Sequence, residues 1–458
     1  MPALQPTAPS SAGRGLGAYR LAAGGLVDRE RLLTFRWDGR PLAACAGDTL
    51  ASALLAHGER LVGRGFKFHR PRGILSAGAE EPNGLVAIGR GDRLDPTARA
   101  TLVRVYDGLE ARPQNCWPSV RFDIGRALDL VAPLWPAGFY NKTFLWPSWH
   151  AYEGIIRRTA GLGDALEGPD PDRYDVANAT CDVLVVGSGA AGLASARLAA
   201  RAGASVMLVE QDLEFGGQLL VETCAIDGRP AAEWVRTTLA ELSANPRVRL
   251  LAATTAFGLY DHGHVGLLER AAESERAGPV RHRYWRVRAR GIVLAAGGLE
   301  QPWVFERNDV PGVMLAGAIR TYARRYGVAA GRRVVLATNN DSAYVAALDL
   351  VQAGVGVAAL VDSRSEPTPD LARAVRSAGV EVLPGAALAA AVGGRQVSAV
   401  EVVPLADAGP RRRLECDAVG TSAGWAPAVH LWSHARGFLA SAAARQCSLL
   451  VAGSAPLS

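Results

Sequence analysis

Cysteine is scarce and scattered in this sequence. The chain of 458 residues has six cysteines, and no two of them form a C-x-x-C pair. This spacing gives no zinc signature and no disulfide framework, and it favours a reducing compartment. The pair His262 and His264 has metal-ligand spacing but lacks a third clustered donor, so the sequence predicts no metal site. The cysteines are Cys45, Cys116, Cys181, Cys224, Cys416 and Cys447.

Lysine and long apolar runs are also scarce. Among 50 basic residues, lysine occurs only at Lys67 and Lys142, and the formal net charge is +6. The arginines are scattered and form no basic helix, so we expect no nucleic-acid partner. The sequence has no basic-then-apolar signal pattern at its start and no apolar run of about 18–20 residues. These absences predict a cytoplasmic protein with no membrane partner.

The remaining composition is that of a globular chain with several domains. Hydrophobic residues make up 49% of the chain and charged residues 21%, enough for a sizeable core. Changes in pattern predict a disordered tail, a small ferredoxin-like domain, an aromatic connector ending in a linker, and two Rossmann-like domains. The predicted ranges are 1–18, 19–112, 113–178, 179–330 with 416–458 for the dinucleotide-binding domain, and 331–415 for the second Rossmann-like domain.

The ferredoxin-like domain is predicted from a hairpin followed by a helix. Residues 32–37 and 41–44 flank the turn Asp38-Gly39, and Asp48 is expected to cap a helix that runs to His57. An iron–sulfur cluster would need four cysteines on the next loop, in plant-type spacing. Residues 64–73 contain none, and Cys45 alone cannot hold a cluster. We therefore expect a cysteine-free ferredoxin-like β-grasp domain without an iron–sulfur cluster.

The strongest motif is a glycine-rich turn between a predicted strand and helix. Gly187 permits a tight turn, Gly189 lets the backbone approach a pyrophosphate, and Gly192 allows close helix–strand packing. Glu210 follows the next strand, about 20 residues on, where a carboxylate accepts hydrogen bonds from ribose hydroxyls and repels a 2′-phosphate. NAD or FAD is thus favoured over NADP, and these residues do not distinguish NAD from FAD. Further expected contacts are Ala190, Ala191, Gln211, Gly217, Gly297 and Ala452.

A second strand–turn–helix unit carries a different turn. Residues 333–337 and 342–353 predict a strand and a helix, but the turn between them reads Thr338-Asn339-Asn340-Asp341. Side chains there should obstruct a pyrophosphate, so this domain is expected to be structural. The predicted fold class is α/β: a two-dinucleotide-binding-domain (Rossmann-like) flavoprotein-type module, preceded by the small ferredoxin-like domain.

Several long motifs resemble one known family. They are Phe66-Lys67-Phe68-His69-Arg70-Pro71-Arg72-Gly73-Ile74, Glu80-Glu81-Pro82-Asn83, Gly138-Phe139-Tyr140-Asn141-Lys142-Thr143-Phe144, the Gly187 turn, and Thr338-Asn339-Asn340-Asp341-Ser342-Ala343-Tyr344. Between about Gly24 and Trp432 the chain resembles the α subunits of heterotetrameric sarcosine oxidases. These enzymes demethylate sarcosine oxidatively to glycine and pass electrons to oxygen.

The resemblance implies cofactors and partners. In this family the α subunit holds NAD, so Gly187, Gly189, Ala190, Gly192 and Glu210 would contact NAD. A β subunit carries FAD and oxidises the amine, smaller subunits complete the assembly, and FMN lies at the α–β interface. The loop residues Arg64, Lys67, Arg70 and Arg72 would then line that interface near the FMN phosphate. The sequence ends without the family's folate-binding domain. We therefore expect a short form or a truncated product that is inactive by itself.

Two alternatives remain open at this point. One is a stand-alone FAD-dependent amine or opine dehydrogenase subunit that binds FAD at the Gly187 turn. The other is a non-catalytic, truncated nucleotide-binding scaffold, because no nucleophile or acid–base pair stands out near the turn. The catalytic residues, the particular N-methyl amine and the oligomeric state are left unassigned by the sequence.

Overall fold

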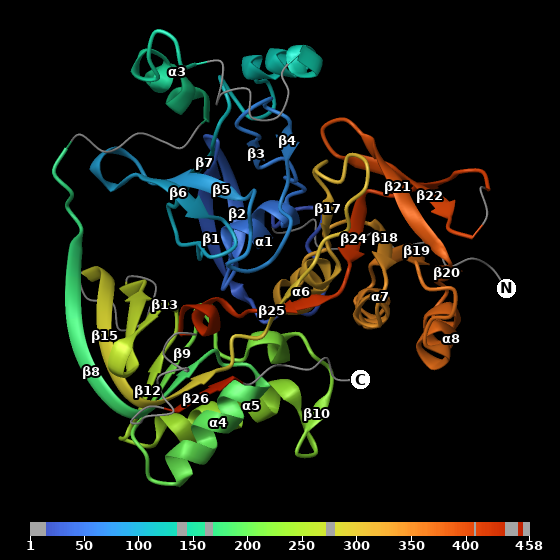
Figure 1. Cartoon of the computed structure of the whole chain (residues 1–458). Coiled ribbons are helices and arrows are strands. Elements are labelled where there is room, and N and C mark those ends of the chain that lie inside the picture. Colours follow the sequence, from blue (N-terminus) through green and yellow to red (C-terminus); the bar gives the residue numbers. More distant parts are fainter. Residues whose placement is uncertain are drawn as a thin grey trace. The chain divides into compact units, whose positions relative to one another are not determined.

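The structure is a computed structural model that describes residues 15–134, 144–160, 168–271, 280–406, 409–435 and 448–451 (Figure 1). The chain divides into two compact units, Met1–Asp170 with Glu300–Gly424 and Pro171–Leu299 with Trp425–Ser458. Most of the predicted tail, the motif at residues 138–143 and the expected contact Ala452 lie outside the described residues. The described helices are too short and too polar to span a bilayer.

The first unit starts with a small mixed sheet that holds one helix. Its elements are β1 (Asp28–Trp37), β2 (Arg40–Ala46), α1 (Leu50–Ala56), β3 (Gly63–Arg64), β4 (Pro71–Arg72), β5 (Leu85–Ile88), η1 (Gly91–Arg93), β6 (Asp95–Arg99) and β7 (Glu110–Pro113). The strand order of the mixed sheet is β2-β1-β7-β5-β6, and β3 and β4 pair separately with each other. Asp38 and Gly39 have φ angles of 49° and 79°, as a two-residue hairpin turn requires. The hairpin and helix therefore lie where the sequence predicts them.

The cap of α1 differs from the prediction. Thr49, not Asp48, is the N-cap residue, and its side chain accepts a hydrogen bond from the Ser52 amide at 3.2 Å. Asp48 is fully buried and forms an ion pair with Arg20 at 2.6 Å. Its carboxylate also accepts hydrogen bonds from the Cys45 amide and the Ser52 hydroxyl. Because the Asp48 carboxylate is engaged in this buried ion pair and links β2 to α1, the neighbouring Thr49 caps the helix instead.

A parallel sheet forms the second part of this unit. Its elements are β17 (Val313–Leu315), α6 (Ala316–Tyr326), β18 (Arg333–Thr338), α7 (Ser342–Gln352), β19 (Gly356–Asp362), α8 (Pro369–Ser377), β20 (Glu381–Pro384) and β24 (Ala418–Ser422). The order is β17-β24-β18-β19-β20. Residues 300–330 and 416–424 thus belong to the unit that contains this parallel sheet. The sequence instead suggested that they belong to the dinucleotide-binding domain. The reason is that β24 pairs with both β17 and β18.

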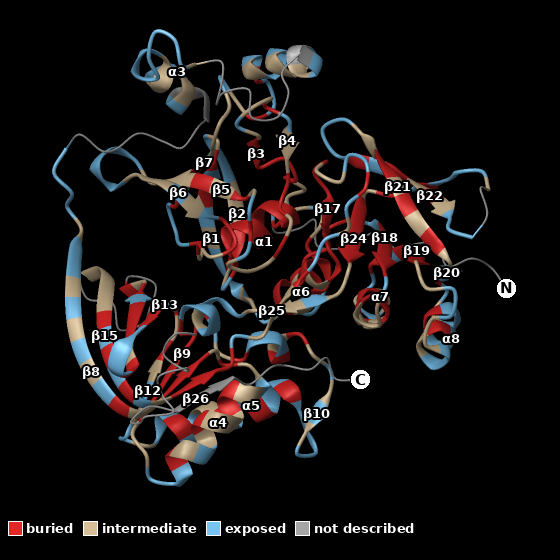
Figure 2. Ribbon diagram, in the orientation of Figure 1, coloured by how far each residue is buried: buried red, intermediate tan, exposed pale blue. Residues whose placement is uncertain are grey.

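An antiparallel sheet in this unit consists of β21 (Ala386–Gly393), β22 (Val397–Pro404) and β23 (Arg412–Glu415). The unit also contains the helices η2 (Ile124–Leu134) and α3 (His150–Ala160). Figure 2 shows that β18, β19 and β24 are buried, while the outward face of α8 is exposed. One apolar core joins the small mixed sheet to the parallel sheet, with Phe35, Tyr322 and Leu336 among its members.

The second unit is built on one larger sheet. Its elements are β8 (Arg173–Val186), α4 (Ala190–Arg201), β9 (Val206–Val209), η3 (Gly217–Leu220), β10 (Ala225–Ile226), β11 (Arg229–Pro230), α5 (Ala231–Ser243), β12 (Val248–Leu251), β13 (Thr254–Tyr260), η4 (Asp261–Gly263), β14 (His264–Glu269), β15 (Val280–Leu294) and β26 (Ser448–Val451); β16 (Gly298–Glu300) and β25 (Trp425–Pro427) are short. The order is β12-β9-β8-β15-β14-β13, with β26 beside β15.

β8 is longer than the sequence indicates. Its residues Arg173 to Asn178 fall in the stretch that reads as a linker, but they pair in parallel with the first half of β15. Apolar residues alternate weakly there, because only one face of the extended strands meets the core. α4 and α5 pack on the other half of the sheet, over an apolar core that includes Val185, Leu193 and Trp234.

Candidate functional site

The Gly187 turn lies at the carboxyl end of β8 and leads directly into α4. The Gly187 amide donates to the Val209 carbonyl at 2.9 Å, which ties the turn to the neighbouring strand. Gly187 has a φ of 95°, and a Cβ there would collide with the Ala295 carbonyl. A Cβ at Gly192 would collide with the Gly187 carbonyl. Both positions therefore require glycine, as the sequence pattern predicts.

Gly189 is different, because its surroundings are open. It is the N-cap of α4, no side chain caps this helix, and a Cβ at Gly189 would have nothing within 4 Å. The first amides of the helix, from Ala190 and Ala191, are those that an intact helix leaves without partners. A Cβ at Gly217 would lie 3.2 Å from the Gly189 Cα, so the second glycine loop meets the first. The result is an open helix N-terminus suited to a pyrophosphate.

Glu210 stands beside this turn and is held by Ser188. Its Oε2 accepts hydrogen bonds from the Ser188 amide at 2.9 Å and the Ser188 hydroxyl at 2.6 Å. Its Oε1 accepts one from the Asp212 amide at 3.0 Å. Since each carboxylate oxygen accepts about two hydrogen bonds, Oε1 keeps capacity for one ribose hydroxyl. Glu210 is only 8% exposed, and burial raises its pKa.

Ser188 also contacts the second glycine loop, at residues 216–217. Sequence reasoning did not assign this serine a role. Its hydroxyl accepts a hydrogen bond from the buried Gly216 amide at 2.9 Å. One side chain thus joins the glycine turn, the acidic residue and the 216–217 loop. A serine at a variable position of the fingerprint gives no signal in the sequence, because only the fold brings Glu210 and Gly216 to it.

The remaining expected contacts lie around this centre. Ala295 donates from its amide to the Val186 carbonyl at 2.8 Å, and Gly297 follows with a φ of 70°. Gln211 is exposed, and its backbone carbonyl accepts a hydrogen bond from the Arg270 guanidinium at 3.2 Å. Among the described residues the structure gathers Gly187, Gly189, Ala190, Ala191, Gly192, Glu210 and Gly217 at one edge of the sheet.

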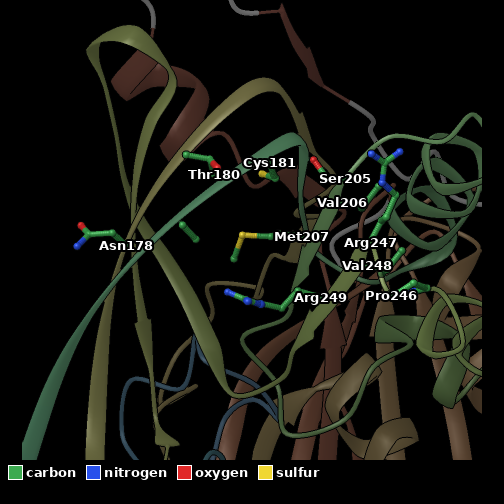
Figure 3. Close-up of a pocket in the computed structure, with 11 residues that line it drawn as sticks. Asn178, Thr180, Cys181, Ser205, Val206, Met207, Pro246, Arg247, Val248 and Arg249 are labelled. Atoms are coloured by element: carbon green, nitrogen blue, oxygen red, sulfur yellow. The ribbon is translucent and has the colours of Figure 1, made fainter.

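A cavity of about 240 Å³ lies at the opposite edge of these strands (Figure 3). Its lining includes Ser205 and Val206, where β9 begins, and Arg247 and Val248, where β12 begins. Because the glycine turn follows the carboxyl end of β8, this cavity is not the dinucleotide site.

The turn of the second Rossmann-like domain is filled by its own side chains. Asn340 accepts hydrogen bonds from the Ser342 amide and hydroxyl, and it donates to the Ser422 hydroxyl at 3.1 Å. Asp362, at the end of β19, corresponds in position to Glu210. It is fully buried and bound by the Tyr344 hydroxyl and the Arg364 guanidinium, both at 2.8 Å. The Asn340 and Asp362 side chains are therefore both bound within the chain and are not available to a nucleotide.

The cationic loop residues are largely engaged within the chain. Arg64 is buried and donates to the Val120 carbonyl at 2.6 Å and 3.0 Å. Arg70 pairs with Asp129 at 2.8 Å, and Arg72 pairs with Asp309. Lys67 lies over the Phe68 ring. Arg64, Arg70 and Arg72 therefore fix the loop, and Phe66, which is 64% exposed, is its most prominent outward side chain.

Two family matches correct the cofactor predictions. Residues 30–116 match the family described as "2Fe-2S iron-sulfur cluster binding domain", and residues 182–264 match "FAD dependent oxidoreductase". The first match contradicts the prediction of a domain without a cluster, and the range contains Cys45 and Cys116, so "cysteine-free" is wrong. The second contradicts NAD as the dinucleotide, and the FMN expectation built on the same resemblance falls with it.

Among its described residues, the structure does not bring together the donors that such a cluster needs. A 2Fe–2S cluster takes four cysteine ligands, and Cys45 is fully buried in the apolar core. Within the described part of the chain, no three His, Cys, Asp or Glu side chains are grouped so that they could hold a metal ion. The described residues therefore do not provide the four ligands that a 2Fe–2S cluster needs. The open turn, the α4 N-terminus and Glu210 do fit the adenine half of FAD.

Three known proteins illustrate the similarity. Over 92% of its length the chain is 49% identical to "Sarcosine oxidase subunit alpha" of Rhizobium meliloti (strain 1021), and 38% identical to that of Corynebacterium sp. (strain P-1). It spans 43% and 40% of these relatives. The crystal structure of L-proline dehydrogenase from P. horikoshii matches with a TM-score of 0.60 and 18% identity, over 90% of this chain and 64% of that one, which supports the fold. The chain is therefore a homologue of sarcosine oxidase subunit alpha.

Proposed function

We propose that this chain is the α-type subunit of a multisubunit sarcosine oxidase and that it binds FAD at the Gly187 turn. The observation that carries the proposal is the 49% identity over 92% of the chain to a sarcosine oxidase α subunit. The reaction would be the oxidative demethylation of sarcosine to glycine, with electrons passed to oxygen. When bound, FAD would supply the capacity to accept and release electrons.

The residues of the turn would bind the dinucleotide without reacting with it. The amides at the start of α4 would donate to the pyrophosphate, and the helix dipole favours that negative charge. Glu210 would accept a hydrogen bond from one ribose hydroxyl through Oε1, since Ser188 already occupies Oε2. A 2′-phosphate would face this buried carboxylate, so NADP and its analogues would be excluded.

Amine oxidation is proposed to require a partner subunit. The polar side chains next to the turn, Ser188 and Glu210, are both engaged in positioning contacts. No nucleophile or acid–base pair accompanies them among the described residues of the turn. The loop at residues 64–73 is a candidate contact for that partner, because Arg70 and Arg72 form ion pairs within the chain while Phe66 is exposed. Exposed aromatic side chains are frequent anchors of protein interfaces.

The proposed function is tested by hydrogen peroxide release from sarcosine. The purified chain is assayed alone, then after co-expression with the other subunits of a sarcosine oxidase. We expect no turnover by the chain alone and sarcosine-dependent peroxide from the co-expressed complex. Robust turnover by the chain alone would instead identify a stand-alone flavoenzyme. A complex that forms but oxidises no N-methyl amine would contradict the proposed reaction.

A further inference from the structure

The outer face of four strands in the second unit combines aromatic and cationic side chains. Along β15, Trp285, Val287 and Ala289 are buried in the apolar core, while Arg286 and Arg288 between them are exposed. The alternation of a strand places these two sets on opposite faces. The neighbouring strands β8, β14 and β13 continue the same outer face by their register.

Aromatic rings on this face contact one another in pairs. Tyr174 on β8 contacts His282 on the adjacent β15 with ring centroids 5.9 Å apart, and Phe257 on β13 reaches across β14 to Tyr284 on β15, with ring centroids 5.8 Å apart. A Cβ at Gly266 would lie 2.6 Å from the Phe257 ring, so this glycine lets the ring lie down on the sheet. Tyr174 remains 56% exposed and Phe257 48% exposed. A folded chain gains little from such rings unless another surface covers them.

The charges on this face are unbalanced. Arg286 and Arg288 form no ion pair with any residue that the structure describes, although Arg286 lies over the Tyr284 ring at 5.5 Å. The acidic residues of the same strands bind other partners. Asp175 and Glu269 bind Arg283 on the inner face, and Asp182 binds Arg290 and Ser205. Among the described residues, the face therefore presents two guanidinium groups with no carboxylate paired to them.

We propose that this arginine–aromatic face, formed by Tyr174, Phe257, Tyr284, Arg286 and Arg288, docks another subunit of the oxidase. The occupant is a folded protein surface that presents carboxylates to the arginines and apolar side chains to the rings. The proposal rests on the proposed function, which assigns this chain to a multisubunit enzyme. Tyrosine, phenylalanine and arginine are enriched in protein interfaces while lysine and acidic residues are depleted, and that is the composition here.

A single-stranded nucleic acid fits this face less well. Bases stack on separate, accessible ring faces, and a backbone needs a track of several cations. Here the rings pack against one another in pairs, and among the described residues of this face the arginines without an ion pair are Arg286 and Arg288. A protein partner needs only a few anchors in a compact patch.

The test compares charge reversal on the face with charge reversal elsewhere in the same unit. The full chain, carrying an affinity tag, is co-expressed with the other sarcosine oxidase subunits as wild type, as Arg286→Glu/Arg288→Glu, and as the control Arg236→Glu. Arg236 is an exposed arginine on α5. The double variant should retain at least about tenfold less partner subunit, because glutamates would meet carboxylates. The control should retain as much as wild type, and all three should contain equal flavin and melt at the same temperature.

Each other outcome counts against the docking face. Equal partner retention by the double variant overturns it, while the proposed function stands on the wild-type complex. Failure of the wild type to retain any subunit overturns both. A fluorescent oligo-dT of about 16 nucleotides provides the second arm: tight binding to the wild type that Arg286→Glu/Arg288→Glu abolishes would replace the protein partner with a nucleic acid.

Discussion

At the scale of single residues, Ser188 does most to organise the dinucleotide site. Its hydroxyl donates to Glu210 and accepts from the Gly216 amide, so it sets both the ribose acceptor and the second glycine loop. The glycines could be predicted from the sequence, because their conformations and close contacts forbid any other residue. Ser188 could not, because its partners come from positions more than 20 residues away along the chain.

Replacing Ser188 by alanine should weaken FAD binding without unfolding the chain. The change leaves the buried Gly216 amide without an acceptor and removes one donor from Glu210, which costs roughly 1–3 kcal/mol. At about 1.4 kcal/mol for each tenfold change, that corresponds to a loss of affinity between about fivefold and about 140-fold. Burial already raises the Glu210 pKa, and losing a donor raises it further. The pH below which FAD affinity falls should therefore move upward.

Titration of the flavin-free chain with FAD between about pH 5 and pH 8 measures both effects. Ser195→Ala is the matched control, since Ser195 lies on α4 and makes no hydrogen bond through its side chain to a described residue. If Ser188→Ala and Ser195→Ala bind FAD equally at every pH, Ser188 has no positioning role.

At the scale of elements, a buried carboxylate holds the start of α6. Glu300 accepts a hydrogen bond from the Gly317 amide at 2.8 Å, and burial raises its pKa to about 7 from 4.5, with smaller effects from Ser422, Gly317, Glu80 and Arg320. The folded pKa exceeds the unfolded one, so the folded chain holds this proton more tightly. The contribution of Glu300 to stability is thus fully present below about pH 4.5 and is lost as pH rises to about 7.

Replacing Glu300 by glutamine should remove this pH dependence. A shift of about 2.5 units corresponds to roughly 3 kcal/mol. Relative to wild type, Glu300→Gln should therefore be more stable at pH 8 than at pH 5, that is, with a larger free energy of unfolding, by up to that amount. Urea unfolding at both pH values measures it, with the exposed Glu306→Gln as control. An unchanged difference between pH 5 and pH 8 would show that Glu300 does not titrate in this range.

Local signals predicted several elements well and others poorly. The hairpin at Asp38-Gly39 and the unit of β18, α7 and β19 follow from turn residues and apolar patterns, which act over a few positions. The first half of β8 was missed because its pairing with β15 is distant in sequence. The assignment of β17 and β24 to the second parallel sheet depends likewise on long-range pairing.

At the scale of the whole molecule, the resemblance indicated the homology correctly and the cofactor incorrectly. The long motifs around residues 66–74 and 338–344 carried the resemblance, and the relatives of that name are 49% and 38% identical to this chain over 92% of its length. The turn itself suits any adenine dinucleotide without a 2′-phosphate, so NAD was favoured only by analogy. The match of residues 182–264 to the FAD dependent oxidoreductase family changes that assignment. Residue chemistry alone could not decide it, because both ligands share the same half.

FAD binding at the Gly187 turn is tested most directly by the nucleotide that the purified chain releases on denaturation. Gly189→Val should fold, because Gly189 has a φ of −65° and a Cβ there has nothing within 4 Å. The valine side chain would occupy the space of the pyrophosphate. Gly154→Val, at another open glycine, is the control. We expect FAD from the wild type and from Gly154→Val, and none from Gly189→Val. Release of NAD from the wild type, or equal FAD from Gly189→Val, would contradict the assignment.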